Sequence, residues 1–118
     1  MGEDALETLD VWKKACRLSV DVYRLMQGCS DLGFKDQLTR SALSIASNIA
    51  EGYERNSRAE LVRFFRIAKG SCGELRTQIY IGLEVGYIPT AARDFIDRAI
   101  EISKMLQGMI KRYSQSPL

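Results

Sequence analysis

The sequence predicts an all-α protein, an antiparallel four-helix bundle with up-down-up-down topology. Apolar residues recur at alternating steps of three and four along four stretches, the pattern of helices that pack along a common seam. Neither proline, Pro89 or Pro117, interrupts these stretches. The turns between them are short, which favours antiparallel neighbours. We therefore expect helices at about residues 9–28, 34–54, 58–85 and 91–113, in one domain that spans residues 1–118.

The first two helices are expected on either side of a short turn. The first apolar series runs through Val11, Ala15, Leu18, Val22 and Leu25, and Gly28 ends it. The second runs through Leu38, Ala42, Ile45 and Ile49. Ser30 or Asp31 can begin the turn, because short polar side chains bond to nearby backbone groups, and Gly33 is expected inside the loop.

The third and fourth helices carry the clearest boundary signals. Ser57 and Glu60 fit a capping box at the start of the third helix, and Gly86 can end it in a left-handed conformation. Pro89 blocks continuation, and Thr90 can cap the fourth helix. The third series is Leu61, Phe65, Ala68, Cys72, Leu75, Ile79 and Leu83; the fourth is Ala92, Ile96, Ala99, Ser103, Leu106, Ile110 and Tyr113.

Composition argues against catalysis, metals and membranes. The chain has no histidine, which removes the commonest general base and metal ligand. Its three cysteines lie far apart without a CxxC pair, so we expect buried, reduced thiols and no cofactor. No apolar run approaches the length of a membrane span, and the start MGEDALETLD lacks the pattern of a signal peptide. We expect a cytoplasmic protein.

A row of polar residues runs along the second helix beside its apolar row. At about 100° per residue, one face collects Gln37, Arg40, Ser44, Asn48, Glu51 and Arg55. One interpretation is a solvated face with a local Glu51–Arg55 pair. We favour a partly buried polar seam against a neighbouring helix or another subunit, because Ser, Asn and Gly52 are small. Asn48 and Glu51 would then need partners such as Arg66, Arg76 or an arginine of another chain.

The third helix contains a small-residue patch with Gly70, Ser71, Gly73 and Glu74. Each glycine inside a helix costs roughly 1 kcal/mol relative to alanine, which suggests tight helix contact there. The stretch GSCG is neither a phosphate loop nor a nucleophile elbow, and no histidine can activate Ser71. Carboxylates at Glu51, Glu54, Glu60 and Glu74 could imitate a di-metal bundle, but such sites use Glu-x-x-His pairs. We expect no catalytic residue and no metal site.

Basic residues gather on the same helix and form a candidate nucleic-acid-binding set: Arg58, Arg63, Arg66, Lys69 and Arg76. All but Arg63 fall within about 80° of one another on the helical wheel, and Tyr80 lies near the same line, where it could stack on a base. A solvated basic face is the alternative, and a net charge of +2 favours it for a single chain. Repetition of the stripe around a ring would change that balance, because the fields of several copies add.

Two motifs carry a family resemblance over about residues 9–112. The pattern R-x-x-x-S-I-x-x-N-I-A-E-G is met by Arg40, Ser44, Ile45, Asn48, Ile49, Ala50, Glu51 and Gly52; F-x-x-x-A-x-G-S-x-x-E-L is met by Phe64, Ala68, Gly70, Ser71, Glu74 and Leu75. The sequence resembles the four-helix-bundle family named after proteins encoded in intervening sequences of bacterial 23S ribosomal RNA genes. Ala46 stands where the family often has proline.

The resemblance implies a ring-shaped homo-oligomer, typically a pentamer. A similar fold serves as the accessory protein of diversity-generating retroelements, which binds nucleic acid and a reverse transcriptase; its transfer to this chain is analogy. Our first hypothesis is a non-enzymatic, ring-forming protein that binds RNA or another nucleic acid through the basic set. The alternative is a structural or protein-interaction module with no nucleic-acid role. Contacts with a partner or between subunits could then come from residues off the main apolar rows: Leu43, Val62, Ile81 and Tyr87.

Overall fold

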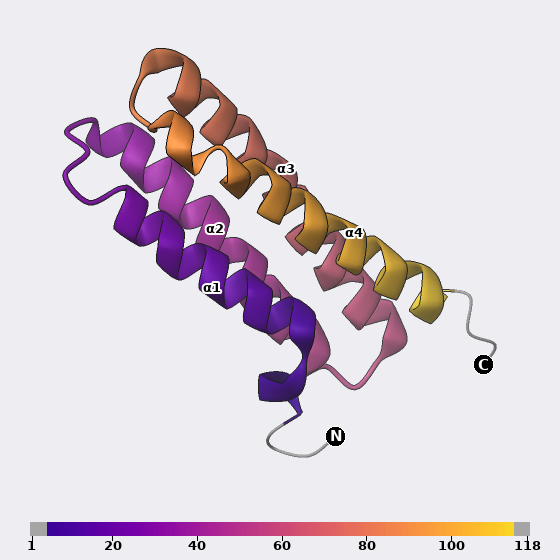
Figure 1. Ribbon diagram of the computed structural model, residues 1–118. Helices are drawn as coiled ribbons and strands as arrows, with labels where there is room; N and C mark the ends of the chain where they lie inside the picture. Colours follow the sequence, from indigo (N-terminus) through magenta and orange to yellow (C-terminus); the bar gives the residue numbers. More distant parts are fainter. Residues whose placement is uncertain (1–4, 115–118) are drawn as a thin grey trace.

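A computed structural model describes residues 5–114 and shows four long helices there (Figure 1). They are α1 (Asp10–Leu25), α2 (Leu32–Tyr53), α3 (Arg58–Val85) and α4 (Asp94–Ser114). Two short 3₁₀ turns, η1 (Leu6–Thr8) and η2 (Thr90–Ala92), precede α1 and α4. No strand occurs within this range, so the predicted all-α four-helix class is confirmed.

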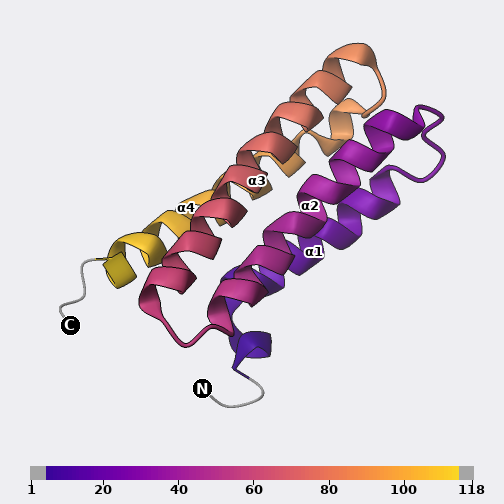
Figure 2. The ribbon, with the colours of Figure 1, turned by 180° about the vertical axis from the view of Figure 1, so that it is seen from behind.

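The helices run antiparallel in an elongated bundle of about 50 × 25 × 22 Å. The α1–α2 and α3–α4 turns lie at one end, and the α2–α3 connection lies at the other (Figures 1 and 2). Helix α3 packs extensively on both α2 and α4, whereas α1 and α4 form the weakest of the four contacts between neighbouring helices. Two ion pairs link that looser pair of helices: Arg98 to Asp21 at 2.8 Å and Lys14 to Glu101 at 3.4 Å.

The apolar rows of all four helices meet in one core. Its largest fully buried side chains include Leu18 of α1, Ile45 of α2, Phe65 of α3 and Leu106 of α4. The ends of the predicted rows are only partly buried and pack against that core: Leu25, Leu83, Ile96 and Tyr113. Val62 was expected off the core rows, but it is 8% exposed and belongs to the core.

Helix boundaries follow the sequence signals at three positions. The Asp31 Oδ1 atom accepts from the Phe34 N–H at 3.0 Å and caps α2, as the Ser57 hydroxyl does for α3 from the Glu60 N–H at 3.0 Å. Gly86 ends α3 in the left-handed region with φ 84°. Glycine reaches that region without steric penalty, which explains the residue found there.

Other boundary predictions need correction. Helix α1 ends at Leu25, before the expected position 28. The chain beyond it forms hydrogen bonds between residues three apart, as in a 3₁₀ turn, such as Gln27 N–H to Arg24 O. Gly33 lies in the first turn of α2, not in the loop, since the Asp31 cap starts the helix earlier. Thr90 does not cap α4: it begins the 3₁₀ turn after Pro89, and α4 starts at Asp94.

Candidate nucleic-acid interface

A hydrogen-bonded polar seam joins α2 to α3. The hydroxyl oxygens of Ser44 and Ser71 lie 2.9 Å apart across the two helices. The Asn48 amide donates to the Ser44 carbonyl and to its hydroxyl, both at 2.9 Å. The favoured interpretation of a partly buried seam against a neighbouring helix therefore holds for Ser44, which meets Ser71 of α3, whereas the half-buried Asn48 bonds within α2. The partner of Asn48 is Ser44, not an arginine as we expected.

Gly52 sets the approach of α2 to α3 near the connection between them. A Cβ atom built there would lie 2.9 Å from the Phe64 Cβ and 3.1 Å from the Leu61 carbonyl oxygen. Real Cβ contacts are longer, so only glycine allows the two backbones to come this close.

The expected tight contact at Gly70 and Gly73 is not made by this chain. A Cβ atom at either position would meet nothing within 4 Å in the part of the chain that the structure describes. Between them, Ser71 faces α2 and Cys72 is buried in the core. Glu74 is exposed on the same helix. Glycine composition pointed to a close approach, but Gly52, not this patch, makes it.

Arg40 and Glu51 belong to surface ion pairs. Arg40 contacts Asp36 at 2.9 Å, and Glu51 contacts Arg55 at 2.9 Å, each four residues away. The Arg40 and Glu51 side chains are well exposed, so each pair contributes only a few tenths of a kcal/mol. Glu51 therefore follows the solvated-face alternative, although its neighbours on the row form the seam.

Unlike three of the other predicted cations, Arg63 has an ion-pair partner within the chain. Its Nε atom donates to the Glu60 carboxylate at 3.0 Å, and its guanidinium carbon lies 4.5 Å from the centre of the Phe64 ring. The hydrogen bond from Arg63, aided by the charges of Arg63 and Arg55, lowers the pKa of Glu60. The Arg63 guanidinium therefore already contacts the Glu60 carboxylate and the Phe64 ring.

The remaining cations form what we call the α3 cationic edge: Arg58, Arg66, Lys69 and Arg76. They lie within about 80° of one another around the helix axis. Lys69 and Arg76 also line a space with residues of α4. Within residues 5–114, no carboxylate comes within 4.0 Å of Arg66, Lys69 or Arg76. Three cations on one edge therefore have no ion-pair partner in the described chain.

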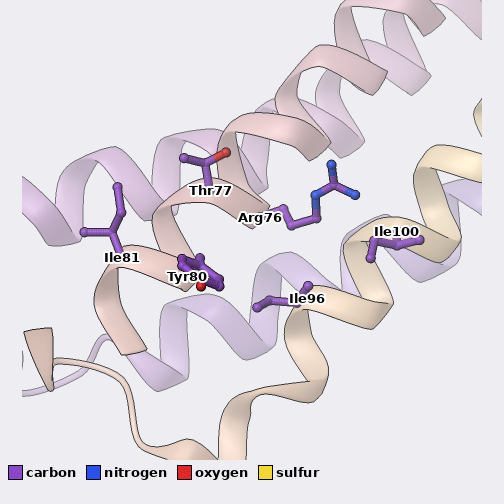
Figure 3. A pocket seen from close by; sticks show the side chains of 6 residues that line it. All are labelled: Arg76, Thr77, Tyr80, Ile81, Ile96 and Ile100. Atoms are coloured by element: carbon purple, nitrogen blue, oxygen red, sulfur yellow. The ribbon is translucent and has the colours of Figure 1, made fainter. Parts of the chain in front are cut away.

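A groove between α3 and α4 adjoins this edge. Its wider part, about 410 Å³, is lined by Arg76, Thr77, Tyr80, Ile81, Ile96 and Ile100 (Figure 3). A smaller, polar part of about 140 Å³ is lined by Lys69, Cys72, Gly73, Arg76, Ala99 and Ser103. Arg76 belongs to both parts, so they adjoin, and we call the whole the α3–α4 groove. No acidic side chain lines either part.

The thiol in the floor of this groove is inert. Burial raises the pKa of Cys72 to about 12, although the nearby charges of Lys69 and Arg76 act in the opposite direction. A thiol that stays protonated is a poor nucleophile and a poor metal ligand. Among residues 5–114, no three His, Cys, Asp or Glu side chains gather as metal ligands.

The family model for the 23S rRNA-intervening sequence protein matches residues 7–108. The chain belongs to this family. A crystal structure of a protein of unknown function from the S23 ribosomal protein family, from Bacteroides thetaiotaomicron, has a similar fold. Its TM-score is 0.80 at 25% sequence identity, over 86% of this chain and 98% of that chain. A search of the curated proteins gives no match.

Membership in the 23S rRNA-intervening sequence protein family confirms the resemblance seen in the two motifs. Of the motif residues, Ser44, Gly52 and Ser71 lie at the contact between α2 and α3, and Asn48 bonds to Ser44, so this part of the signature describes the fold. None of the helices described here is long and apolar enough to cross a bilayer.

Sequence reasoning missed the contribution of α4 to the groove. Ile96 and Ser103 were assigned to the core row, and Ile100 was given no role. Arg76 and Tyr80 lie four residues apart on α3, and that spacing signalled a shared face. The register of α3 against α4 decides which residues of α4 lie opposite them. That register cannot be predicted from the apolar pattern of one helix.

Proposed function

We propose that this member of the 23S rRNA-intervening sequence protein family binds RNA through the α3 cationic edge and catalyses no reaction. The observation that carries the proposal is the set of three cations without an acidic partner, Arg66, Lys69 and Arg76, beside a groove that contains no carboxylate. Phosphates are natural partners of such an edge, and guanidinium groups match phosphate geometry.

RNA is the preferred ligand because the family takes its name from 23S ribosomal RNA. A protein with three free thiols that acts on RNA belongs in the reducing cytoplasm.

We further propose that the chain acts as a homo-oligomer, with a ring such as a pentamer as the expected form. Large apolar side chains remain exposed away from the groove: Leu43 at 49%, Ile67 at 41% and Tyr87 at 45%. These can contact other subunits. A net charge of +2 per chain is small, and repetition of the cationic edge around a ring would raise the local potential.

A binding assay with a charge-matched control tests the RNA proposal. Fluorescence anisotropy would follow a 23S rRNA stem-loop with wild type, with R66Q/K69Q/R76Q and with K13Q/R17Q/R24Q. The control removes three exposed cations from α1, so both triple variants lose the same net charge. We expect the α3 variant to bind about tenfold more weakly or worse, and the control to change little. Equal losses in both variants, or no binding by wild type at low salt, would contradict the proposal.

The second candidate is a structural or protein-interaction module, and the exposed apolar side chains favour it. Light scattering separates the outcomes. An oligomer that does not bind RNA at low salt would support this candidate over RNA binding. A strictly monomeric mass would remove the assembly part of both.

A further inference from the structure

We propose that the α3–α4 groove holds one unpaired nucleotide, so that the protein prefers looped or single-stranded RNA to continuous duplex. The base would lie in the wider, apolar part against Tyr80, and its phosphate would lie at Arg76. This inference rests on the proposed RNA-binding function and adds which RNA structure is recognised.

The wider part offers a stacking surface and apolar walls. Tyr80 is 53% exposed, and Ile81 beside it is 49% exposed. Ile96 and Ile100 approach from α4 and face the side of α3 that carries Arg76 and Tyr80 (Figure 3). Aromatic side chains next to a cationic groove are the platforms on which proteins stack unpaired bases. At about 410 Å³, the space falls in the range of roughly 300–1,000 Å³ that small organic ligands occupy.

Arg76 lies close enough to Tyr80 for one nucleotide to contact both side chains. Arg76 precedes Tyr80 by four residues, which places their Cβ atoms about 5–6 Å apart on one helix face. A nucleotide likewise carries its phosphate one sugar away from its base. Lys69 lies two turns further along α3, about 10 Å along the axis, where it can meet a neighbouring phosphate. Arg76 lines both parts, so one strand can contact both cations.

Charge and shape together select this occupant. The groove has an apolar part with the Tyr80 ring, a cationic part and no acidic lining residue, so it fits a ligand with a flat apolar portion beside an anion. In a duplex the base faces are covered by stacking, and only phosphates and groove edges are presented. A duplex would therefore contact the cations and leave the apolar part empty. An unpaired nucleotide fills both parts.

Two RNAs with a common stem would test the inference. One is closed by an unpaired loop that contains 2-aminopurine, a base whose fluorescence falls on stacking; the other is a blunt duplex of the same length. Anisotropy gives both affinities for wild type, Y80S and Y23S. Tyr23 is the matched control, an α1 tyrosine that is 46% exposed. Both substitutions are on exposed side chains, so the fold should tolerate them.

We expect wild type to bind the looped RNA about tenfold more tightly than the duplex, with a drop in 2-aminopurine fluorescence. Y80S should lose that preference and the fluorescence change while its duplex affinity stays the same. Y23S should behave as wild type. A further variant measured in the same way, Y80F, should retain the preference because it keeps the ring.

Three results would overturn the inference. The first is equal binding of both RNAs by wild type, which would leave general RNA binding through the cations intact. The second is a loss of duplex affinity in Y80S equal to its loss for the loop. The third is a fall in oligomer mass in Y80S, which would place a second copy of the chain in the groove. If neither RNA binds at low salt, the proposed function itself fails.

Discussion

Replacing Gly52 by alanine should destabilise the protein, although the same change in most helices stabilises. Gly52 lies in the last turn of α2, where alanine gains at most about 0.5–1 kcal/mol through the unfolded chain and the helix propensity. Its new Cβ would lie 2.9 Å from the Phe64 Cβ and 3.1 Å from the Leu61 carbonyl oxygen. Both atoms are fixed to the α3 backbone, so no side-chain rotation relieves the contact.

The magnitude follows from these two opposing effects. Overpacking a well-packed interior costs about 1–3 kcal/mol, and a clash with backbone-fixed atoms belongs at the upper end of that range. After subtraction of the propensity gain, we expect G52A to lower the free energy of unfolding by about 1–2 kcal/mol. For a chain of this size that corresponds to a fall in Tm of about 4–8 °C.

Gly70 is the matched control for this experiment. It lies inside α3, and a Cβ there would meet nothing within 4 Å in the described chain. G70A should therefore raise the free energy of unfolding by about 0.5–1 kcal/mol. Urea unfolding and thermal melts of wild type, G52A and G70A, at one protein concentration, give the two signs.

The prediction is that G52A and G70A change the free energy of unfolding in opposite directions. If G52A were as stable as G70A, the close approach of α2 to α3 would not depend on glycine, and our account of the α2–α3 packing would be wrong. A loss of stability in G70A comparable to that in G52A would also refute the reasoning for the isolated chain, because it would show a contact at Gly70 that the chain itself does not make.

Three further changes have definite expected outcomes. S71A should lower the free energy of unfolding by about 1 kcal/mol in urea, because it removes the hydroxyl bond across α2 and α3. D31A should cost about 1–2 kcal/mol by removing the α2 cap; it should also lower the pKa of Tyr87 in an ultraviolet titration, since the hydrogen bond to Asp31 raises that pKa. Above pH 9, wild type should lose about 1.4 kcal/mol per pH unit relative to C72A, because the Cys72 pKa of about 12 exceeds the unfolded value of 9.0 and only the unfolded thiol ionises there.

Each of these outcomes has a control. S47A removes an exposed hydroxyl from α2 and should be neutral; a loss equal to that of S71A would argue against a special role for the seam. D31N keeps a capping side chain and should retain most of the stability. If wild type and C72A show parallel stability curves between pH 9 and 11, Cys72 does not titrate as its burial indicates.

Local signals predicted the helices because each boundary depends on nearby residues. Ser57 caps α3 and Gly86 ends it, and both effects act over a few residues. The apolar rows likewise needed only helical spacing, so the core followed from them. Thr90 was assigned the wrong role because Pro89 is followed by a short 3₁₀ turn, and the sequence offers no strong mark that separates such a turn from a helix start.

The surface was harder to predict, since it depends on how helices are turned toward each other. Ser44 was assigned to the polar row and Ser71 to the small-residue patch, but only the packed structure shows that they bond to each other. The predicted tight contact at Gly70 was wrong because a glycine allows another helix to come close but does not require that one does. The ion pair of Arg63 was also predictable, because Glu60 lies three residues before it.

The salt dependence of RNA binding tests the central claim most directly. The affinity for one 23S rRNA stem-loop would be measured across a range of salt concentrations for wild type and R66Q/K69Q/R76Q. If all three cations contact phosphates, the slope of log affinity against log salt should become shallower by about 2–3 in the variant. An unchanged slope would contradict the account, since it would show that the α3 cationic edge does not meet the RNA backbone.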